Sequence, residues 1–152
     1  MKALTLFVLL PLLLWLGARL AVVLLSPPPA TLAGPQRPLQ ACPGSPNCVS
    51  STDPQPAIAP LSGPQAGGLF RQLSERIAGD GRARIVQRTD HYLHAEYRSR
   101  VFGFIDDLEL RLADDGQRLD LRSASRLGYS DFGVNLQRLQ ALNAGLLPGD
   151  DT

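Results

Sequence analysis

The sequence predicts an α+β fold: a small, mostly antiparallel four-stranded sheet with two helices packed on one face, preceded by an N-terminal transmembrane helix. Three observations carry this prediction. An apolar run opens the chain at residues 3–25, alternating apolar and polar residues fill much of residues 83–124, and helical periodicity lies on either side of that region. Short connections between the strands favour antiparallel pairing, with the second face of the sheet charged and open to water.

The apolar run at residues 3–25 contains a single charge, Arg19, which is near enough to the far interface to snorkel. As a helix the run would measure about 34 Å, enough to cross a hydrocarbon core of ~30 Å. A cleaved signal peptide is the alternative, although its apolar region is usually about 7–15 residues. Leu39-Gln40-Ala41-Cys42 only loosely resembles a lipoprotein signal, because Cys42 does not follow the apolar run directly.

Charge before the run sets the expected orientation. Lys2 and the terminal amine precede the apolar residues, and the positive-inside rule then keeps the N-terminus in the cytoplasm. We therefore expect a single-pass protein of a bacterial inner membrane, held through residues 3–25, with its C-terminal domain in the periplasm. The remaining chain divides into a linker at 26–64, an α+β domain at 65–147 and a frayed tail at 148–152.

Residues 26–64 hold eleven of the 13 prolines and few large apolar side chains. This composition is typical of an extended spacer. Cys42 and Cys48 lie within it, and their close spacing predicts a local disulfide in an oxidising compartment. A metal site is the alternative, but the only histidines, His91 and His94, are far along the chain.

Periodicity places the elements of the domain. Apolar residues at helical spacing predict a helix that begins at Ala66 and ends before Gly79-Asp80-Gly81. These apolar residues are Leu69, Phe70, Leu73 and Ile77. Alternation predicts strands at 83–88, 92–99 and 106–112. A second helix is predicted from Val134, with Leu136, Leu139, Leu142 and Leu146 on its apolar side.

Residues 114–117, Asp-Asp-Gly-Gln, predict a tight hairpin that leads into the fourth strand. With Asp115-Gly116 as the loop, apolar residues face each other on one side of the hairpin and opposite charges on the other. The predicted pairs are Leu112 with Leu119, Leu110 with Leu121, Arg111 with Asp120 and Glu109 with Arg122.

The loop at residues 122–135 is the first candidate site, because it gathers guanidinium, hydroxyl and carboxylate groups before a helix N-terminus. We expect a pocket for a carboxylate, phosphate or sugar. The candidate ligand-binding residues here are Arg122, Ser125, Arg126, Tyr129, Ser130, Asp131 and Asn135. The alternative is structural: Ser130 or Asp131 caps the last helix and the arginines clamp the loop to neighbouring carboxylates.

A cluster of carboxylates, Glu96, Asp106, Asp107 and Glu109, is the second candidate. Paired carboxylates can act as acid and base or bind hard metals. The hairpin register already pairs Glu109 with Arg122, however, and alternating charge is also typical of a solvated sheet face. We therefore include Glu96, Asp106 and Asp107 in the candidate ligand site and assign no catalytic or metal-binding residue.

Four segments resemble a known family: 42–51 (CPGSPNCVSS), 92–100 (YLHAEYRSR), 102–109 (FGFIDDLE) and 122–135 (RSASRLGYSDFGVN). In this order they are similar to the uncharacterised domain-of-unknown-function family 1499 of bacteria and photosynthetic eukaryotes, from about Cys42 to Leu147. The resemblance implies no activity. It implies that the cysteine loop belongs to the folded unit, and it directs attention to the same region that holds the candidate residues.

The sequence thus predicts a membrane-anchored envelope protein that acts as a binding or accessory module for a small polar or anionic ligand or an envelope protein. No nucleophile motif, cofactor motif or metal cluster is recognisable, so no cofactor is expected. A formal net charge of +1 gives no reason to expect nucleic acid as a partner. The alternative is an envelope hydrolase or lyase that uses Glu96, Asp106, Asp107 or Asp131.

Overall fold

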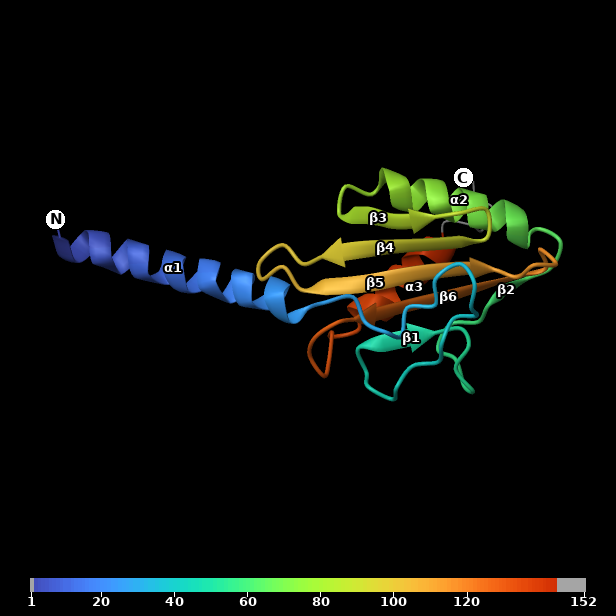
Figure 1. Ribbon diagram of the computed structural model, residues 1–152, viewed down its shortest axis with the longest axis horizontal. Coiled ribbons are helices and arrows are strands. Elements are labelled where there is room, and N and C mark those ends of the chain that lie inside the picture. Colours follow the sequence, from blue (N-terminus) through green and yellow to red (C-terminus); the bar gives the residue numbers. More distant parts are fainter. Residues whose placement is uncertain (1, 145–152) are drawn as a thin grey trace, which may run out of the picture.

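An antiparallel sheet lies at the centre of the computed structural model, which describes the backbone of residues 2–144 and the side chains of residues 9–144. The strands follow the order β1-β6-β5-β4-β3, and β2 also pairs with β6 (Figure 1). In chain order the elements are α1 (Lys2–Leu25), β1 (Cys48–Ser50), β2 (Leu61–Ser62), α2 (Ala66–Gly79), β3 (Ala83–Arg88), β4 (Tyr92–Arg98), β5 (Ile105–Leu112), β6 (Arg118–Ser125) and α3 (Val134–Ala144).

Helices α2 and α3 cover one face of the sheet, as predicted. The apolar face of α2 buries Phe70, Leu73 and Ile77, and α3 adds Leu139. Both meet alternate residues of the central strands in one core, because residues two apart in a strand share a face. The strand members of this core are Leu93, Ala95, Tyr97, Leu108, Leu110, Leu112, Leu119 and Leu121. The predicted Leu146 and the tail at 148–152 lie outside the described residues.

The predicted hairpin register is confirmed. Leu112 pairs with Leu119, and Leu110 pairs with Leu121. Arg111 lies opposite Asp120, and Glu109 lies opposite Arg122. Gly116 has a φ of 69°, a left-handed conformation that glycine adopts at little cost and that closes the turn.

The prediction of four strands is wrong, because the sheet has six. The additional strands, β1 and β2, have three and two residues and lie inside the segment that we expected to be a spacer. Their shortness and the surrounding prolines hide the alternation that identifies longer strands. Both pair with β6, so residues 48–62 form an edge of the domain.

The first part of the Pro-rich segment, residues 26–47, also packs on the domain, and we call it the strap. It crosses the sheet on the face opposite the helices (Figure 1). Ala33 and Leu39 bury their side chains against Tyr92 in a second, small apolar cluster. The predicted disulfide is confirmed: Cys42 and Cys48 are bonded at the end of the strap, where β1 begins.

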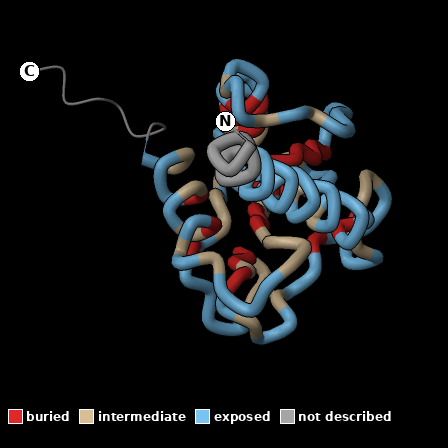
Figure 2. The backbone as a smooth tube through the Cα atoms, turned by 90° about the vertical axis from the view of Figure 1, so that its left-hand side faces the viewer, coloured by how far each residue is buried: buried red, intermediate tan, exposed pale blue. Residues whose placement is uncertain are grey.

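Helix α1 extends away from the sheet (Figure 1), and its residues from Leu9 to Leu25 are mostly exposed (Figure 2). Leu24 and Leu25, for example, are 71% and 66% exposed. Within the described part of the chain, no helix combines the length and the apolar character that a membrane crossing needs.

Candidate functional site

The central strands carry a layer of charged side chains on the face opposite the helices. His94 and Glu96 come from β4, Asp107 and Glu109 from β5, and Arg122 from β6. The pairing register places His94 beside Glu109, Glu96 beside Asp107, and Glu109 beside Arg122. All five residues are buried.

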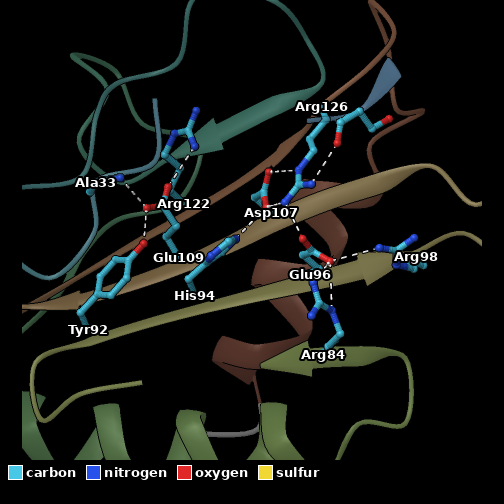
Figure 3. A network of polar contacts seen from close by, with 11 residues as sticks. Ala33, Arg84, Tyr92, His94, Glu96, Arg98, Asp107, Glu109, Arg122 and Arg126 are labelled. Carbon is cyan, nitrogen blue, oxygen red and sulfur yellow. Dashed lines mark hydrogen bonds and ion pairs between the residues drawn. The ribbon is translucent and has the colours of Figure 1, made fainter. Parts of the chain in front are cut away.

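Glu109 is the centre of the first half of this layer (Figure 3). One carboxylate oxygen accepts hydrogen bonds from the Tyr92 hydroxyl at 2.7 Å and from the Ala33 backbone N–H at 2.8 Å. The other accepts one from Arg122 at 3.1 Å. The carboxylate is fully enclosed, so these donors replace the water that it loses on folding.

Arg126 is the centre of the second half. Its guanidinium donates to Asp107 at 2.8 and 2.7 Å and to Glu96 at 2.7 Å (Figure 3). It also donates to the backbone carbonyl of Ser26 at 3.1 Å, at the start of the strap. His94 contacts the same Asp107 through Nε2 at 2.7 Å.

Two arginines complete the layer at its outer edge. Arg84 and Arg98 both donate to Glu96, at 2.8 and 3.3 Å, while their own side chains stay 63% and 44% exposed. Glu96 therefore joins the buried charges to the surface of the domain.

The arginines keep the buried carboxylates ionised. Burial by itself raises the pKa of Asp107, but hydrogen bonds from Arg126 and His94 outweigh this and lower the pKa below its usual value. The pKa of Glu96 is lowered in the same way, against burial, by Arg84 and Arg126. Burial and the neighbouring Glu109 raise the pKa of Tyr92, so its hydroxyl remains a donor.

The expectation that this face is wet is therefore wrong. The strap covers the charged layer, and the charges pair with one another and with strap backbone groups instead of with water. Alternating charges in a sequence predict a polar face. They do not show whether water covers that face or whether its charges are buried and paired with one another. The arrangement can fix the strap to the sheet.

Three of the predicted site residues lie on the helix side of the sheet instead. Asp106 pairs with Arg138 of α3 at 2.7 Å and accepts a hydrogen bond from Ser125 at 2.6 Å. Asn135 donates to Ser125 and to the backbone carbonyl of Asn47, both at 3.1 Å. These bonds join α3 to the end of β6 and to the strap.

The remaining three lie in the loop before α3. Asp131 accepts the backbone N–H of Gly133 at 2.9 Å and that of Asn135 at 2.8 Å, which makes it a cap for the helix. Ser130 accepts the N–H of Phe132. Tyr129 is 79% exposed. The ten predicted residues thus fall into three groups and do not line one pocket.

Two open clefts lie at one edge of the domain, and of the ten predicted residues only Glu96 is among those that line them. The first, which we call the α2–α3 cleft, has a volume of about 480 Å³ and includes Arg76, Asp80, Arg82, Tyr97 and Arg138 among its lining residues. The second, the β3–β4 cleft, has about 720 Å³ and includes Arg82, Arg84, Arg98 and Arg100. The arginines come from separate segments, so no local motif signals either cleft. Arg82 and Arg84, and likewise Arg98 and Arg100, are two residues apart, but the arginines of each cleft come from at least two distant parts of the chain.

Within the α2–α3 cleft the polar groups are held in place. Arg138 lies over the Tyr97 ring at 4.4 Å while it pairs with Asp106. Arg82 pairs with Asp80 at 3.1 Å and holds the pKa of that carboxyl below its usual value. Burial raises the pKa of Tyr97 to about 12, so the phenol stays neutral. Nowhere among the described residues do three or more His, Cys, Asp or Glu side chains gather as a metal site.

A family model described as "Protein of unknown function (DUF1499)" matches residues 38–146. The chain belongs to this family. The match confirms the resemblance seen in the sequence, and it includes the cysteine loop, the charged layer and all the candidate residues. The DUF1499 description assigns no activity, and no curated protein and no solved structure matches the chain.

Proposed function

We propose that the protein is a membrane-anchored envelope module that binds a small anionic ligand in the α2–α3 cleft. The observation that supports a ligand here is the charge of the cleft, which three guanidinium groups line, those of Arg76, Arg82 and Arg138. Arg82 pairs with Asp80 and Arg138 with Asp106, which leaves one positive charge in excess. Guanidinium groups suit carboxylates and phosphates because their fixed N–H donors match two oxygens at once.

The size and lining of the cleft support a small ligand. Pockets for small molecules usually measure about 300–1,000 Å³, and this cleft has about 480 Å³. Its walls also include Val134, Ala141 and Leu142, which would contact an apolar part of the ligand. Because Arg138 and Arg82 are already held by Asp106 and Asp80, binding would order few side chains.

The proposed anchor is α1. From Leu9 to Leu25 its apolar side chains are largely exposed, an arrangement that is unfavourable in water and favourable in lipid. Residues 3–8 continue the apolar sequence toward the N-terminus. We propose a bacterial inner membrane with the domain in the periplasm, where the Cys42–Cys48 disulfide would be stable.

The lowered pKa values and the burial of Glu96 and Asp107 favour a binding function over hydrolase or lyase activity. A general acid needs a raised pKa and contact with its substrate, whereas Glu96 and Asp107 have lowered pKa values. Both side chains are also almost fully buried, at 4% and 1% exposed.

A thermal-shift experiment on the full chain in detergent tests the ligand. Phosphate, pyrophosphate, citrate and a sugar phosphate would be titrated against the native protein, Arg76→Gln, and the control Arg71→Gln, which changes an exposed arginine of α2 outside the cleft. A probe at 100 times its Kd stabilises the folded state by about 2.7 kcal/mol. We expect that gain in the native protein and in Arg71→Gln, and its loss in Arg76→Gln. Equal responses in all three proteins, or none, would refute the ligand site.

A separate experiment tests the anchor. Membranes that contain the full chain would be washed with alkaline carbonate, which removes peripheral proteins but leaves embedded ones. We expect the protein to stay in the membrane pellet and to float with lipid. Its release by carbonate would refute the anchor, whatever the ligand experiment shows.

A further inference from the structure

We propose that the domain rests directly on an anionic bilayer surface, with two aromatic loops inserted among the lipid headgroups. The contact surface, which we call the basal end, consists of residues 98–104, residues 129–134 and the arginines of the β3–β4 cleft. Both loops lie at the end of the sheet where α1 joins the domain (Figure 1). The inference rests on the membrane anchor of the proposed function. The basal end shares Arg82 and Val134 with the α2–α3 cleft, but the membrane contact needs no ligand in that cleft.

Contacts between α1 and the first loop, residues 98–104, determine where this loop lies along the helix. The Trp15 indole donates to the carbonyl of Val101 at 3.0 Å, and Arg19 donates to the carbonyl of Arg100 at 3.0 Å. Trp15 and Arg19 precede the end of α1 by ten and six residues, about 15 and 9 Å along the helix. The loop therefore lies beside the C-terminal half of α1, and the N-terminal half of the helix extends beyond it toward the proposed bilayer.

The side chains of both loops suit contact with a bilayer surface. Outside α1, the exposed large hydrophobic residues of the described chain are concentrated here, with only Val86 elsewhere. They are Val101, Phe102, Phe104, Tyr129, Phe132 and Val134. Phe132 is 92% exposed in a left-handed conformation, with φ of 56°, that a bulky residue seldom adopts. Tyr and Trp are enriched at the membrane–water interface, and Phe is common on the lipid-facing side of helices that lie in it.

Positive charge borders the same surface. Arg82, Arg84, Arg98 and Arg100 line the open β3–β4 cleft, and the carboxylates among its lining residues are Asp80 and Glu96. Arg84 and Arg98 are largely exposed although they pair with Glu96. This excess of cations next to inserted aromatic side chains is complementary to anionic lipid phosphates.

The strap prevents the basal end from turning away from the membrane. The residue after α1, Ser26, is buried and is held by Arg126 through its carbonyl. Ala33 is held by Glu109. The chain between the anchor and the sheet is thus fixed to the domain, so an embedded α1 brings the basal end to the lipid surface.

Depth-dependent fluorescence quenching of the full chain in vesicles tests this inference. Trp15 is the only tryptophan, so a Trp15→Phe background, which loses the bond to Val101 but keeps those of Arg19 to the loop, allows one indole to be placed at a time. Phe102→Trp would probe the basal end, and Val86→Trp, at the other exposed hydrophobic position, would be the matched control. Vesicles of zwitterionic phosphatidylcholine, with and without added anionic phosphatidylglycerol, would carry nitroxide quenchers near the headgroups or deep in the chains.

We expect the indole at position 102 to be blue-shifted and at least twofold more quenched by the shallow nitroxide than the one at position 86. Changing Arg84, Arg98 and Arg100 together to Gln should reduce this quenching in anionic vesicles only. If the protein floats with the vesicles but both indoles behave as in water, the basal contact is refuted and the anchor stands. If quenching is equal with and without anionic lipid, the cationic part is refuted. A protein that does not float refutes the anchor, and the basal contact with it.

Discussion

The carboxylate of Glu109, in the middle of β5, accepts a hydrogen bond of 2.8 Å from the backbone N–H of Ala33, 76 residues earlier in the chain. Its other oxygen pairs with Arg122 in a site where the two side chains are 0% and 3% exposed. One buried charge therefore connects the strap to two strands of the sheet. Because α1 precedes the strap directly, this connection also determines how the hydrophobic helix is joined to the domain.

Glu109→Gln is expected to destabilise the fold strongly. The amide keeps the shape of the side chain but leaves the Arg122 guanidinium buried without its counter-charge, and breaking one partner of such a pair costs about 3–5 kcal/mol. Urea unfolding of the full chain in mild detergent would measure the loss. Glu75→Gln is the control, because Glu75 is 70% exposed in its pair with Arg88 and such pairs contribute about 1 kcal/mol or less. Equal losses in the two variants would contradict the structural role of Glu109.

The elements that could be predicted are those in which a local sequence pattern and the tertiary structure agree. The hairpin at Asp115-Gly116 fixed the register from Glu109 to Arg122 because turn chemistry, apolar alternation and charge all favour the same pairing. Helix α2 was predictable for the same reason, since Phe70, Leu73 and Ile77 recur at helical spacing and are all buried.

The strap could not be predicted, because its interactions come from the backbone and from distant residues. The Ala33 N–H and the Ser26 carbonyl contact Glu109 and Arg126, and neither contact depends on a local motif. The predicted site residues lie in separate parts of the domain for a related reason. Asp106 and Asp107 are adjacent in sequence, but they lie on opposite faces of β5, where one pairs with Arg138 and the other with Arg126.

Acid should weaken the fold through Glu96 and Asp107. Both have a pKa below the usual value in the folded protein, so the unfolded chain binds more protons near pH 4. Their stabilisation is therefore complete above their ordinary pKa values, 4.5 and 3.8, and is lost as pH falls through the lower folded values. Urea midpoints at pH 7, 5, 4 and 3 should fall mainly below pH 5. Glu96→Gln should be less stable at pH 7 and show a shallower acid dependence; an unchanged slope would contradict this account.

Asp131 should contribute as a helix cap. Its carboxylate accepts the N–H groups of Gly133 and Asn135, and loss of a capping side chain costs about 0.5–2 kcal/mol. Asp131→Ala is expected to lower the free energy of unfolding by that amount, while Asp131→Asn, which can still accept these bonds, should retain most of it. A catalytic carboxylate would behave differently: Asn would abolish an activity and leave stability unchanged.

The disulfide between Cys42 and Cys48 should stabilise the edge of the sheet next to the strap. Cys48 begins β1 and pairs with Ala124 of β6, and the bond closes a short loop with a separation of six residues. Loop-closure entropy for such a loop gives about 2 kcal/mol. Reduction should therefore lower Tm by roughly 5–10 °C and increase amide hydrogen exchange at residues 47–51 more than in β4 and β5. The double variant Cys42→Ser, Cys48→Ser should have the same Tm as the reduced protein, and adding reductant should not change that Tm. Uniform exchange across all strands after reduction would show instead that the bond supports the whole domain.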